Sequence, residues 1–225
     1  MNKDRLLHLL ESSALTYKDQ QSIPEDGVLC QVDDVPSGTQ YVIYKDGDTM
    51  TIVFRGTDSF GDVIHDLQFF KKEIPYGNTS SKIRVHTGFL HMYKSRGVRD
   101  RIHSHMSDRI RQVFVAGHSL GAALAVLCAV DLQYNFPWCD FEVYLYGCPR
   151  VGNRAFADSY NKRLFKTLRV ENGNDIVTKL PFAWMGYRHV GIRLHVGAPR
   201  ISLCYVHADH DLKRYYAHLF NQFQP

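Results

Sequence analysis

The stretch VFVAGHSLGAALAVLCA, residues 113–129, passes from a short apolar run through a polar centre into a longer apolar run. The first run is typical of a buried strand, and the second is long enough for a buried helix. The pentapeptide Gly117-His118-Ser119-Leu120-Gly121 between them fits the pattern G-x-S-x-G. Glycines suit a sharp strand-to-helix turn because larger side chains there would clash with the adjacent strand or helix. The stretch therefore predicts that Ser119 stands above the edge of a sheet.

The rest of the chain continues this alternation of strands and helices. Runs expected to be extended are 39–45, 48–56, 112–117, 141–147, 166–173 and 187–197, and those with helical spacing are 1–17, 59–70, 87–110, 120–134, 153–164 and 208–223. The first two extended runs are separated by Asp-Gly-Asp, which predicts a hairpin, whereas residues 18–38 are polar and rich in turn formers. The alternation predicts an α/β fold with a mostly parallel twisted sheet flanked by helices, within a single domain over residues 1–225.

Composition excludes several classes of protein. The net charge is only +4 in 225 residues, and the densest basic region, 94–111, mixes Lys and Arg with Asp and His without interleaved aromatic residues. It therefore predicts a solvated helix face rather than a nucleic-acid surface. No apolar run reaches the length of a membrane span. Five cysteines without metal or disulfide spacing, and an N-terminus unlike a secretory signal, predict a cytoplasmic protein, or a secreted one if a signal was removed.

A serine at this turn has two interpretations. It can cap the following helix, or it can be a nucleophile, because the Leu120 amide and the helix dipole would favour a developing negative charge. The strand before it and the helix after it favour the nucleophile. A nucleophilic serine needs a downstream acid and a histidine. Of the acids, Asp175 follows a predicted strand directly, whereas Asp131 and Asp158 fall within predicted helices and are expected at the surface.

Several longer blocks resemble the class 3 lipases, the α/β-hydrolases typified by fungal triacylglycerol lipases. They are TIVFRGTDSFGDVIHDLQF (51–69), VHTGFLHMY (85–93), VAGHSLGAALA (115–125), YGCPRVGNRAFA (146–157) and RVENGNDIVTKLP (169–181). By position, the resemblance implies Ser119 as nucleophile, Asp175 as the acid of the triad and Thr57 as an oxyanion donor beside the Leu120 amide. The chain departs from the family at Val63, where relatives often carry Trp, and at Thr178, where proline is usual.

The histidine that would act as base is less clear from sequence. His210 fits an H-x-L-x-x-Y pattern of bacterial, viral and plant members, and it lies near the expected start of the last helix, where an imidazole can swing between Asp175 and Ser119. His218 resembles the H-L ending of the fungal enzymes, and His207 is a further alternative. We expect His210. A metal site at His-Ala-Asp-His-Asp, 207–211, lacks partner ligands, and neither a metal nor another cofactor is implied.

The resemblance implies hydrolysis of lipid acyl esters, as in an acylglycerol lipase or a phospholipase, through an acyl-enzyme. It also implies a lipid or ester substrate and peripheral contact with a membrane or lipid-droplet surface, without nucleic acid. The apolar stripe Phe60, Val63, Ile64 and Leu67 predicts either a lid over the cleft or a core-packing helix. Alternative functions are a short-chain esterase, an acyltransferase and a non-catalytic lipase-like scaffold for ligand binding or signalling.

Overall fold

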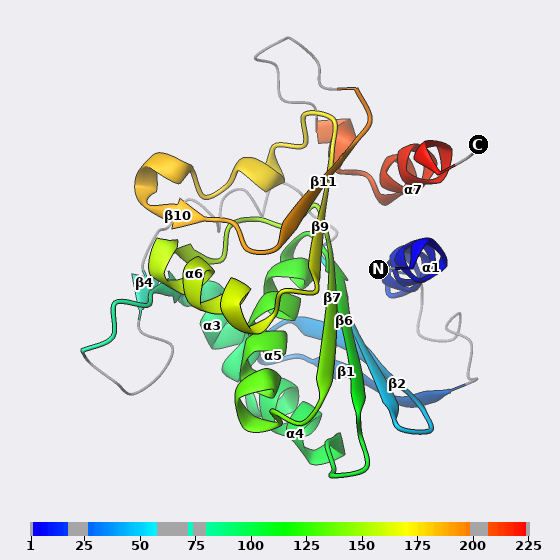
Figure 1. Cartoon of the computed structure of the whole chain (residues 1–225), viewed down its shortest axis with the longest axis vertical. Coiled ribbons are helices and arrows are strands. Elements are labelled where there is room, and N and C mark those ends of the chain that lie inside the picture. Colours follow the sequence, from blue (N-terminus) through cyan, green and yellow to red (C-terminus); the bar gives the residue numbers. More distant parts are fainter. Residues whose placement is uncertain (1, 18–26, 58–71, 74–79, 199–206, 224–225) are drawn as a thin grey trace.

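A seven-stranded sheet forms the centre of the protein, in a computed structural model that describes residues 2–17, 27–57, 72–73, 80–198 and 207–223 (Figure 1). In spatial order its strands are β1 (Val28–Asp34), β2 (Thr39–Asp46), β3 (Thr49–Phe54), β6 (Gln112–His118), β7 (Asp140–Tyr146), β9 (Thr167–Asn172) and β11 (Ile192–Val196). β1, β2 and β3 pair antiparallel, and β3, β6, β7, β9 and β11 pair parallel. The predicted hairpin and the mostly parallel sheet are confirmed.

Helices cover both faces of this sheet, with α3 (Thr87–Lys94), α5 (Leu120–Asn135) and α6 (Arg154–Arg163) on one side and α1 (Lys3–Leu15) and α7 (Leu212–Gln222) on the other (Figure 1). Successive side chains of a strand point to opposite faces. On β6, Val113 and Val115 accordingly join the core under α5, whereas Phe114 and Ala116 join the core under α1 and α7. β6 is therefore a nearly continuous apolar run, because both of its faces are buried.

The two terminal helices pack against each other, which brings both ends of the chain to one side of the sheet (Figure 1). The Lys3 ammonium donates to the Phe223 carbonyl at 2.6 Å, and the Tyr146 hydroxyl donates to the Leu6 carbonyl at 2.5 Å. No helix in the described ranges combines the length and the apolar character that crossing a bilayer requires.

A second, smaller antiparallel sheet has the order β10 (Tyr187–Arg188), β8 (Gly152–Asn153), β5 (Val85–His86) and β4 (Lys72–Glu73). Short 3₁₀ helices interrupt the connections of the C-terminal half: η3 (Val177–Lys179), η4 (Ala183–Met185) and η5 (His207–His210). The chain therefore leaves β9, forms η3 and η4, returns through β10 to β11, and reaches α7 by way of η5.

The single long helix predicted over 87–110 is wrong. The structure divides this region into α3, a π-helical turn η2 (Arg96–Asp100) and α4 (Arg101–His105), with extended backbone at Ser95. The Ser95 hydroxyl donates to the Asp34 carboxylate at 2.6 Å, and a side chain at Gly97 would collide with that carboxylate. A distant contact thus breaks a segment whose local spacing is helical throughout.

The interpretation of residues 18–38 as turn-rich was also incomplete, because β1 (Val28–Asp34) occupies part of it. This strand is at the edge of the sheet and pairs only with β2 among the described strands. Most of its side chains are partly or fully exposed, and Cys30 and Asp34 are the buried ones. Such a strand lacks the apolar alternation by which half-buried strands are predicted.

Candidate functional site: a serine, a carboxylate and an imidazole at the carboxyl edge of the sheet

Ser119 joins β6 to α5 in a strained conformation. Its φ is 57° and its ψ is −127°, and it is the one non-glycine residue with positive φ in the described part of the chain. Such backbone geometry costs on the order of 1–3 kcal/mol and persists only where the surrounding structure enforces it. Here the strand supplies one constraint, because the Ser119 amide donates to the Tyr146 carbonyl of β7 at 2.9 Å.

Close packing around the turn explains why its flanking residues are glycines. A Cβ at Gly117 would lie 2.5 Å from the Gly121 carbonyl carbon, and one at Gly121 would lie 2.5 Å from the Phe54 carbonyl oxygen. A Cβ at Gly56 would lie 3.2 Å from the Ser119 Cβ. Because Gly117 and Gly121 face backbone atoms, side chains there would push α5 away from β3 and β6, whereas a Cβ at Gly56 would also collide with the Tyr17 hydroxyl and the His118 carbonyl.

The Ser119 side chain is buried, and its hydroxyl makes no hydrogen bond to the described residues. The residue is 1% exposed, and within the described ranges its Oγ has no hydrogen-bond partner. A serine that capped α5 would accept a hydrogen bond from the first turn of the helix, and no such bond forms. The hydroxyl is therefore free to react or to bind a ligand.

Asp175 and His210 meet beside this turn. Asp175 follows β9, its side chain is fully buried, and its Oδ2 lies 2.8 Å from His210 Nδ1. A Cβ at Gly147, the residue after β7, would lie 3.0 Å from His210 Cε1 and 3.1 Å from Asp175 Oδ2. The absence of a side chain at that position therefore makes room for the pair. The carboxyl ends of β6, β7 and β9 thus bring Ser119, Gly147 and Asp175 to one edge of the sheet.

Two further donors satisfy the Asp175 carboxylate. The Val177 amide donates to Oδ1 at 2.9 Å, and the Tyr215 hydroxyl of α7 donates to Oδ2 at 2.6 Å. Burial, and then the nearby Asp175 charge, raise the pKa of Tyr215 well above 10, so its phenol remains a donor. The Thr178 hydroxyl donates to the Asp175 carbonyl at 2.8 Å, so this departure from the family pattern adds a contact to the loop.

Asp209 attaches η5 to the loop that carries Asp175. Its Oδ2 accepts from the Asn174 amide at 3.0 Å, and its carbonyl accepts from the Asn172 side-chain amide at 2.9 Å. Gly173 has a φ of +48°, and a Cβ there would lie 2.6 Å from Asp209 Oδ2. These contacts fix the residue before His210 against the strand that precedes Asp175.

His118 was not among the predicted site residues, although it precedes the serine. Its Nε2 lies 3.0 Å from the His210 carbonyl, and its Nδ1 lies 2.9 Å from the Tyr17 hydroxyl. A carbonyl only accepts, so Nε2 carries the proton and Nδ1 accepts from Tyr17. Burial, and then the charge of His210, hold the pKa of His118 well below 6.5. The neutral ring also lies against the His210 ring, with 4.5 Å between centroids, and positions that residue.

The alternative histidines lie differently. His218 of α7 places its Nδ1 at 2.6 Å from the Asn172 side-chain oxygen, so its hydrogen bond is to β9 and not to the Asp175 carboxylate. The side chain of His207 lies outside what the structure describes. Geometry therefore favours His210, because its imidazole is paired with the predicted acid.

Thr57 and Leu120, the two expected oxyanion donors, line one cavity of about 180 Å³. The Leu120 amide opens α5 and has no acceptor within the helix. Gly56, Arg55 and Met92 also line this cavity. The two residues come from the end of β3 and the start of α5, which run side by side in the fold.

Other predictions concern ranges beyond this cluster. The stripe Phe60, Val63, Ile64 and Leu67 lies outside the described residues. In the ranges that are described, no group of His, Cys, Asp and Glu is arranged to hold a metal ion.

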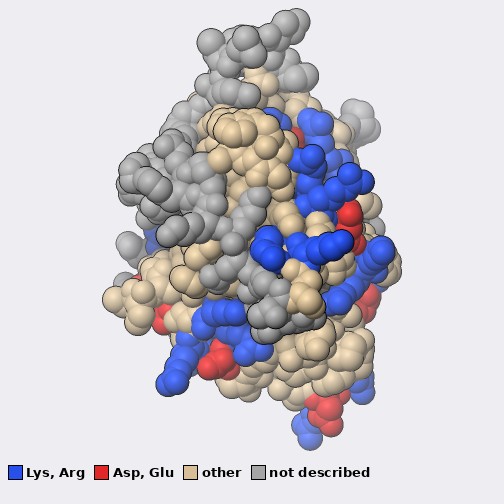
Figure 2. Space-filling model, turned by 90° about the vertical axis from the view of Figure 1, so that its left-hand side faces the viewer, with Lys and Arg blue, Asp and Glu red and all other residues tan. Residues whose placement is uncertain are grey.

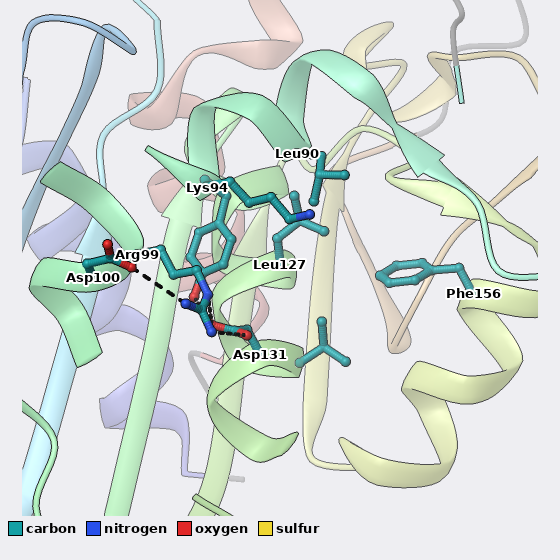
Figure 3. Close-up of a pocket in the computed structure, with 9 residues that line it drawn as sticks. Leu90, Lys94, Arg99, Asp100, Leu127, Asp131 and Phe156 are labelled. Carbon is teal, nitrogen blue, oxygen red and sulfur yellow. Dashed lines mark hydrogen bonds and ion pairs between the residues drawn. The ribbon is translucent and has the colours of Figure 1, made fainter. Parts of the chain in front are cut away.

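Asp131 is not at the surface, contrary to expectation, whereas Asp158 is exposed. The Asp131 carboxylate accepts from Tyr93 Oη at 2.9 Å and pairs with Arg99 Nε at 3.0 Å and His103 Nε2 at 2.6 Å. Asp131 lines a cavity of about 320 Å³ between α3, η2, α5 and α6. Leu90, Leu127 and Phe156 are among its apolar walls (Figure 3). Helical spacing could not reveal this role, because its partners come from α3, η2 and α4.

Comparison with known proteins agrees with this arrangement. The sequence model of the family described as Lipase (class 3) matches residues 51–185. A lipase from Rhizomucor miehei is 37% identical over 151 residues, which cover 64% of this chain and 40% of that protein. Phospholipase A(1) DAD1, chloroplastic, from Arabidopsis thaliana is 33% identical over 149 residues, which cover 59% of this chain and 33% of that protein. The chain thus spans a third to two fifths of the length of these two curated relatives.

Solved structures match over more of their length. A triacylglycerol lipase described as having a serine protease triad as its catalytic centre superposes with a TM-score of 0.77 at 26% identity, covering 92% of both chains. The Rhizomucor miehei triacylglyceride lipase gives a TM-score of 0.76 at 25% identity, again over 92% of both. The predicted α/β-hydrolase fold is thereby confirmed.

Proposed function

We propose, from the premise that this chain belongs to the class 3 lipase family, that it hydrolyses carboxylic esters of lipids through an acyl-serine intermediate. The observation that carries the proposal is Ser119, a strained and buried serine without a hydrogen-bond partner in the described ranges, beside a buried carboxylate–imidazole pair. A structural serine would use its hydroxyl to cap the helix. Strain at a residue whose hydroxyl is left free is instead typical of a reacting group.

In the proposed first step, His210 Nε2 accepts the Ser119 hydroxyl proton while Oγ attacks the ester carbonyl carbon. Asp175 holds the His210 Nδ1 proton and stabilises the imidazolium that forms. Tyr215 and the Val177 amide keep that carboxylate hydrogen-bonded in its buried position. The negative charge that develops on the carbonyl oxygen would be bound by the amides of Leu120 and Thr57.

The tetrahedral intermediate then collapses with loss of the alcohol, which takes the proton from His210. Water attacks the acyl-serine with His210 as base, and the acid product leaves with Ser119 regenerated. Acyl transfer to an alcohol other than water would share the first half of this sequence. Asp175, His210 and Ser119 therefore have the same roles in the acyltransferase alternative, whereas a non-catalytic scaffold would need none of them.

Lipid acyl esters are the proposed substrates. The names of three groups of relatives, lipase, phospholipase A(1) and mono- and diacylglycerol lipase, support this substrate class. Contact with a membrane or a lipid-droplet surface would follow from such substrates. The cavity lined by Thr57, Met92, Leu120 and Leu124 carries both polar and apolar groups, as a site for an acyl ester requires.

We also propose a reducing, cytoplasmic location. Cys30, Cys128, Cys139 and Cys148 are buried and unpaired, which is usual where thiols stay reduced. Some relatives are named secreted mono- and diacylglycerol lipases. Fractionation of source cells tests the location, and recovery from the medium would contradict it.

Labelling with a fluorophosphonate probe, followed by p-nitrophenyl ester hydrolysis against acyl chain length, tests the catalytic proposal. We expect Ser119→Ala to abolish labelling, and His210→Ala to lower turnover by at least about 1000-fold while His218→Ala retains most of it. Labelling that survives Ser119→Ala would reject the serine as nucleophile. Full activity in His210→Ala with loss in His218→Ala would reject the assignment of the base.

A further inference from the structure

An exposed aromatic pair projects from the segment that follows the Asp175 loop. Phe182 and Trp184 flank Ala183 at the start of η4, with exposed fractions of 36% and 80%. Their rings are stacked, with 6.0 Å between centroids and 12° between planes. A tryptophan with 80% of its surface exposed gives up most of the stabilisation that burial of a large aromatic side chain normally supplies. Such exposure is typical of a surface that contacts something else.

Two arginine side chains hold the turn that carries this aromatic pair. The Arg150 guanidinium donates to the Pro181 carbonyl at 2.9 Å and also to the Lys179 carbonyl. On the far side, the Arg188 guanidinium donates to the Ala183 carbonyl at 2.9 Å, and Gly186 closes the turn with a φ of +82°. The backbone is therefore ordered before any partner arrives, which lowers the entropic cost of binding.

The turn is also anchored at both ends. Leu180 is packed into the core beneath α5, and Tyr187, fully buried, pairs β10 with β8. Between these anchors, residues 182–184 and Gly186 are exposed. We call residues 182–184 the tip. Its backbone is held by residues on both sides, so the exposure of its side chains does not result from a loosely packed loop.

Positive charge lies on the elements that precede and follow residues 182–184 in the chain, η3 and β11. The buried carboxylate of Glu171 is contacted by Arg169, Lys179 and Arg193, so these four side chains together carry two more positive charges than negative ones. Arg193 has 53% of its side chain exposed, and the Lys179 side chain 31%. Figure 2 looks onto the side of the molecule that carries η4 and shows Lys and Arg side chains beside an uncharged protrusion.

The tip is on the same side of the fold as the candidate site. Asp175, at the carboxyl end of β9, is joined to the tip by η3 alone, and in Figure 1 η4 lies at the upper end, as do the carboxyl ends of β6, β7 and β9. The chain's other tryptophan, Trp138, precedes β7 and therefore lies at the opposite, amino edge of the sheet. Of the chain's two tryptophans, one is thus near the candidate site and the other is remote from it.

We propose that Phe182 and Trp184 insert into the interfacial region of an anionic phospholipid bilayer while Lys179 and Arg193 meet its headgroups. Tryptophan is favoured at this depth because its ring is apolar and its indole N–H is polar. Each basic side chain near an anionic surface adds attraction that salt weakens. Docked in this way, the protein would face the bilayer with the edge of the sheet that carries Ser119. The inference extends the proposed function, but binding itself requires no turnover.

Tryptophan fluorescence tests this docking surface directly. Trp138→Phe leaves Trp184 as the single reporter, and Trp184→Phe leaves Trp138 as a matched control in the same chain. The vesicles are ether-linked phosphatidylcholine with or without ether-linked phosphatidylglycerol, because ether lipids contain no ester to hydrolyse. With phosphatidylglycerol present, we expect Trp184 emission to shift to the blue and to be quenched by brominated acyl chains, whereas Trp138 emission is unchanged.

Binding strength provides the second measurement. We expect Trp184→Ala to lower the partition coefficient about tenfold, as when one large apolar side chain no longer leaves water. Added salt should weaken binding to vesicles with phosphatidylglycerol and have little effect on the weaker binding to phosphatidylcholine alone. Turnover of a soluble short-chain ester should be the same in Trp184→Ala and wild type, whereas turnover of vesicle-bound ester falls.

Three results would overturn the inference: equal quenching of both tryptophans, unchanged partitioning of Trp184→Ala, or a dimer in solution that Trp184→Ala dissociates. The last result would assign the tip to a second copy of the chain. If vesicles bind through Trp184 but no ester is hydrolysed, the docking surface stands and the proposed function fails.

Discussion

At the scale of single residues, the candidate site depends on polar side chains that have no freedom to move. Asp175 is fully buried and accepts from an imidazole, a phenol and a backbone amide. A buried carboxylate that loses one donor is still desolvated, and no hydrogen bond then compensates for that cost. Tyr215 is therefore as much a part of the arrangement as His210, although it touches no reacting atom.

Tyr215→Phe tests this positioning role. We expect kcat for a soluble ester to fall about tenfold, since a hydrogen bond to a charged group is worth about 1.5–3 kcal/mol and part of it is lost. KM should stay close to the wild-type value, because the Tyr215 hydroxyl contacts Asp175 and no reacting atom. Tyr216→Phe, on the neighbouring residue of the same helix, is the matched control. An unchanged kcat in Tyr215→Phe would show that the phenol is only structural.

At the scale of elements, two features hold α5 in place: glycines around its first turn and the charged side chain of Asp131 near its C-terminus. The first turn of the helix approaches β3 and β6 so closely that Gly117 and Gly121 face backbone atoms. Towards its C-terminus, Asp131 links the helix to α3, η2 and α4. These two constraints fix both the height of Ser119 above the sheet and the packing of the helices around it.

Gly121→Ala should separate the helix from the sheet. Its Cβ would lie 2.5 Å from Phe54 O and 2.6 Å from Arg55 O, both of them backbone atoms that cannot rotate away. We expect a loss of about 3 kcal/mol in unfolding free energy, at the upper end of the usual cost of overpacking, together with loss of esterase activity. Gly47→Ala is the control, because its Cβ meets nothing within 4 Å and only the φ of +56° is unfavourable. Equal stability of the two variants by urea unfolding would contradict the close approach.

The two aspartates expected at the surface offer a matched comparison. Asp131→Ala removes the buried acceptor of the Tyr93 hydroxyl and the shorter of the two ion pairs of Arg99, so we expect a loss of about 3 kcal/mol. Asp158→Ala removes an exposed pair with Arg154 and should stay within about 0.5 kcal/mol of wild type. Thermal unfolding of both variants decides the point. If the two shift Tm equally, the Asp131 network contributes no more than a surface pair.

At the scale of the whole molecule, the sheet separates two cores, one under α3, α5 and α6 and the other under α1 and α7. Neutral imidazoles are part of this interior. His118 Nε2 donates to the His210 carbonyl at 3.0 Å, and His189 Nε2 donates to the Thr178 carbonyl at 2.7 Å. That residues 1–225 form one domain stays a prediction.

These two histidines should make stability depend on pH. Burial foremost, aided for His118 by the charge of His210 and for His189 by Arg169 and Arg150, holds both pKa values well below 6.5. The unfolded chain therefore binds protons that the folded chain does not once the pH drops below about 6.5. Their contribution to stability is present above that pH and is lost as the pH falls towards their folded pKa values.

Urea unfolding between about pH 7.5 and pH 5.5 measures this effect, and each histidine should contribute up to about 1.4 kcal/mol per pH unit below pH 6.5. Replacing His189 with Gln should reduce the slope by one such contribution, whatever its effect on stability at neutral pH. A His189→Gln slope equal to that of wild type would show that the buried ring is protonated in the folded protein.

The sequence alone determined the strand–turn–helix around Ser119, the hairpin of β2 and β3, and the parallel strands that follow. Each of these depends on residues within a few positions of one another, because glycine spacing and apolar periodicity are local properties. The order of predicted strands and loops also favoured Asp175 among the acids, since a residue in the loop just past a buried strand lies at the carboxyl end of the sheet. Thr57 was assigned as an oxyanion donor from the family resemblance alone, because a threonine at the end of a strand does not by itself suggest that role.

Tertiary structure alone decided which histidine meets Asp175, where the segment 87–110 breaks, and that Asp131 is buried. The partners in these contacts are 35 positions apart for His210 and Asp175, 61 for Ser95 and Asp34, and 28 for His103 and Asp131. Whether such residues meet depends on the order of strands in the sheet and on how the helices pack across it. A short window of sequence contains neither the strand order nor the helix packing. Helical spacing therefore cannot tell His210 from His218, or the buried Asp131 from the exposed Asp158.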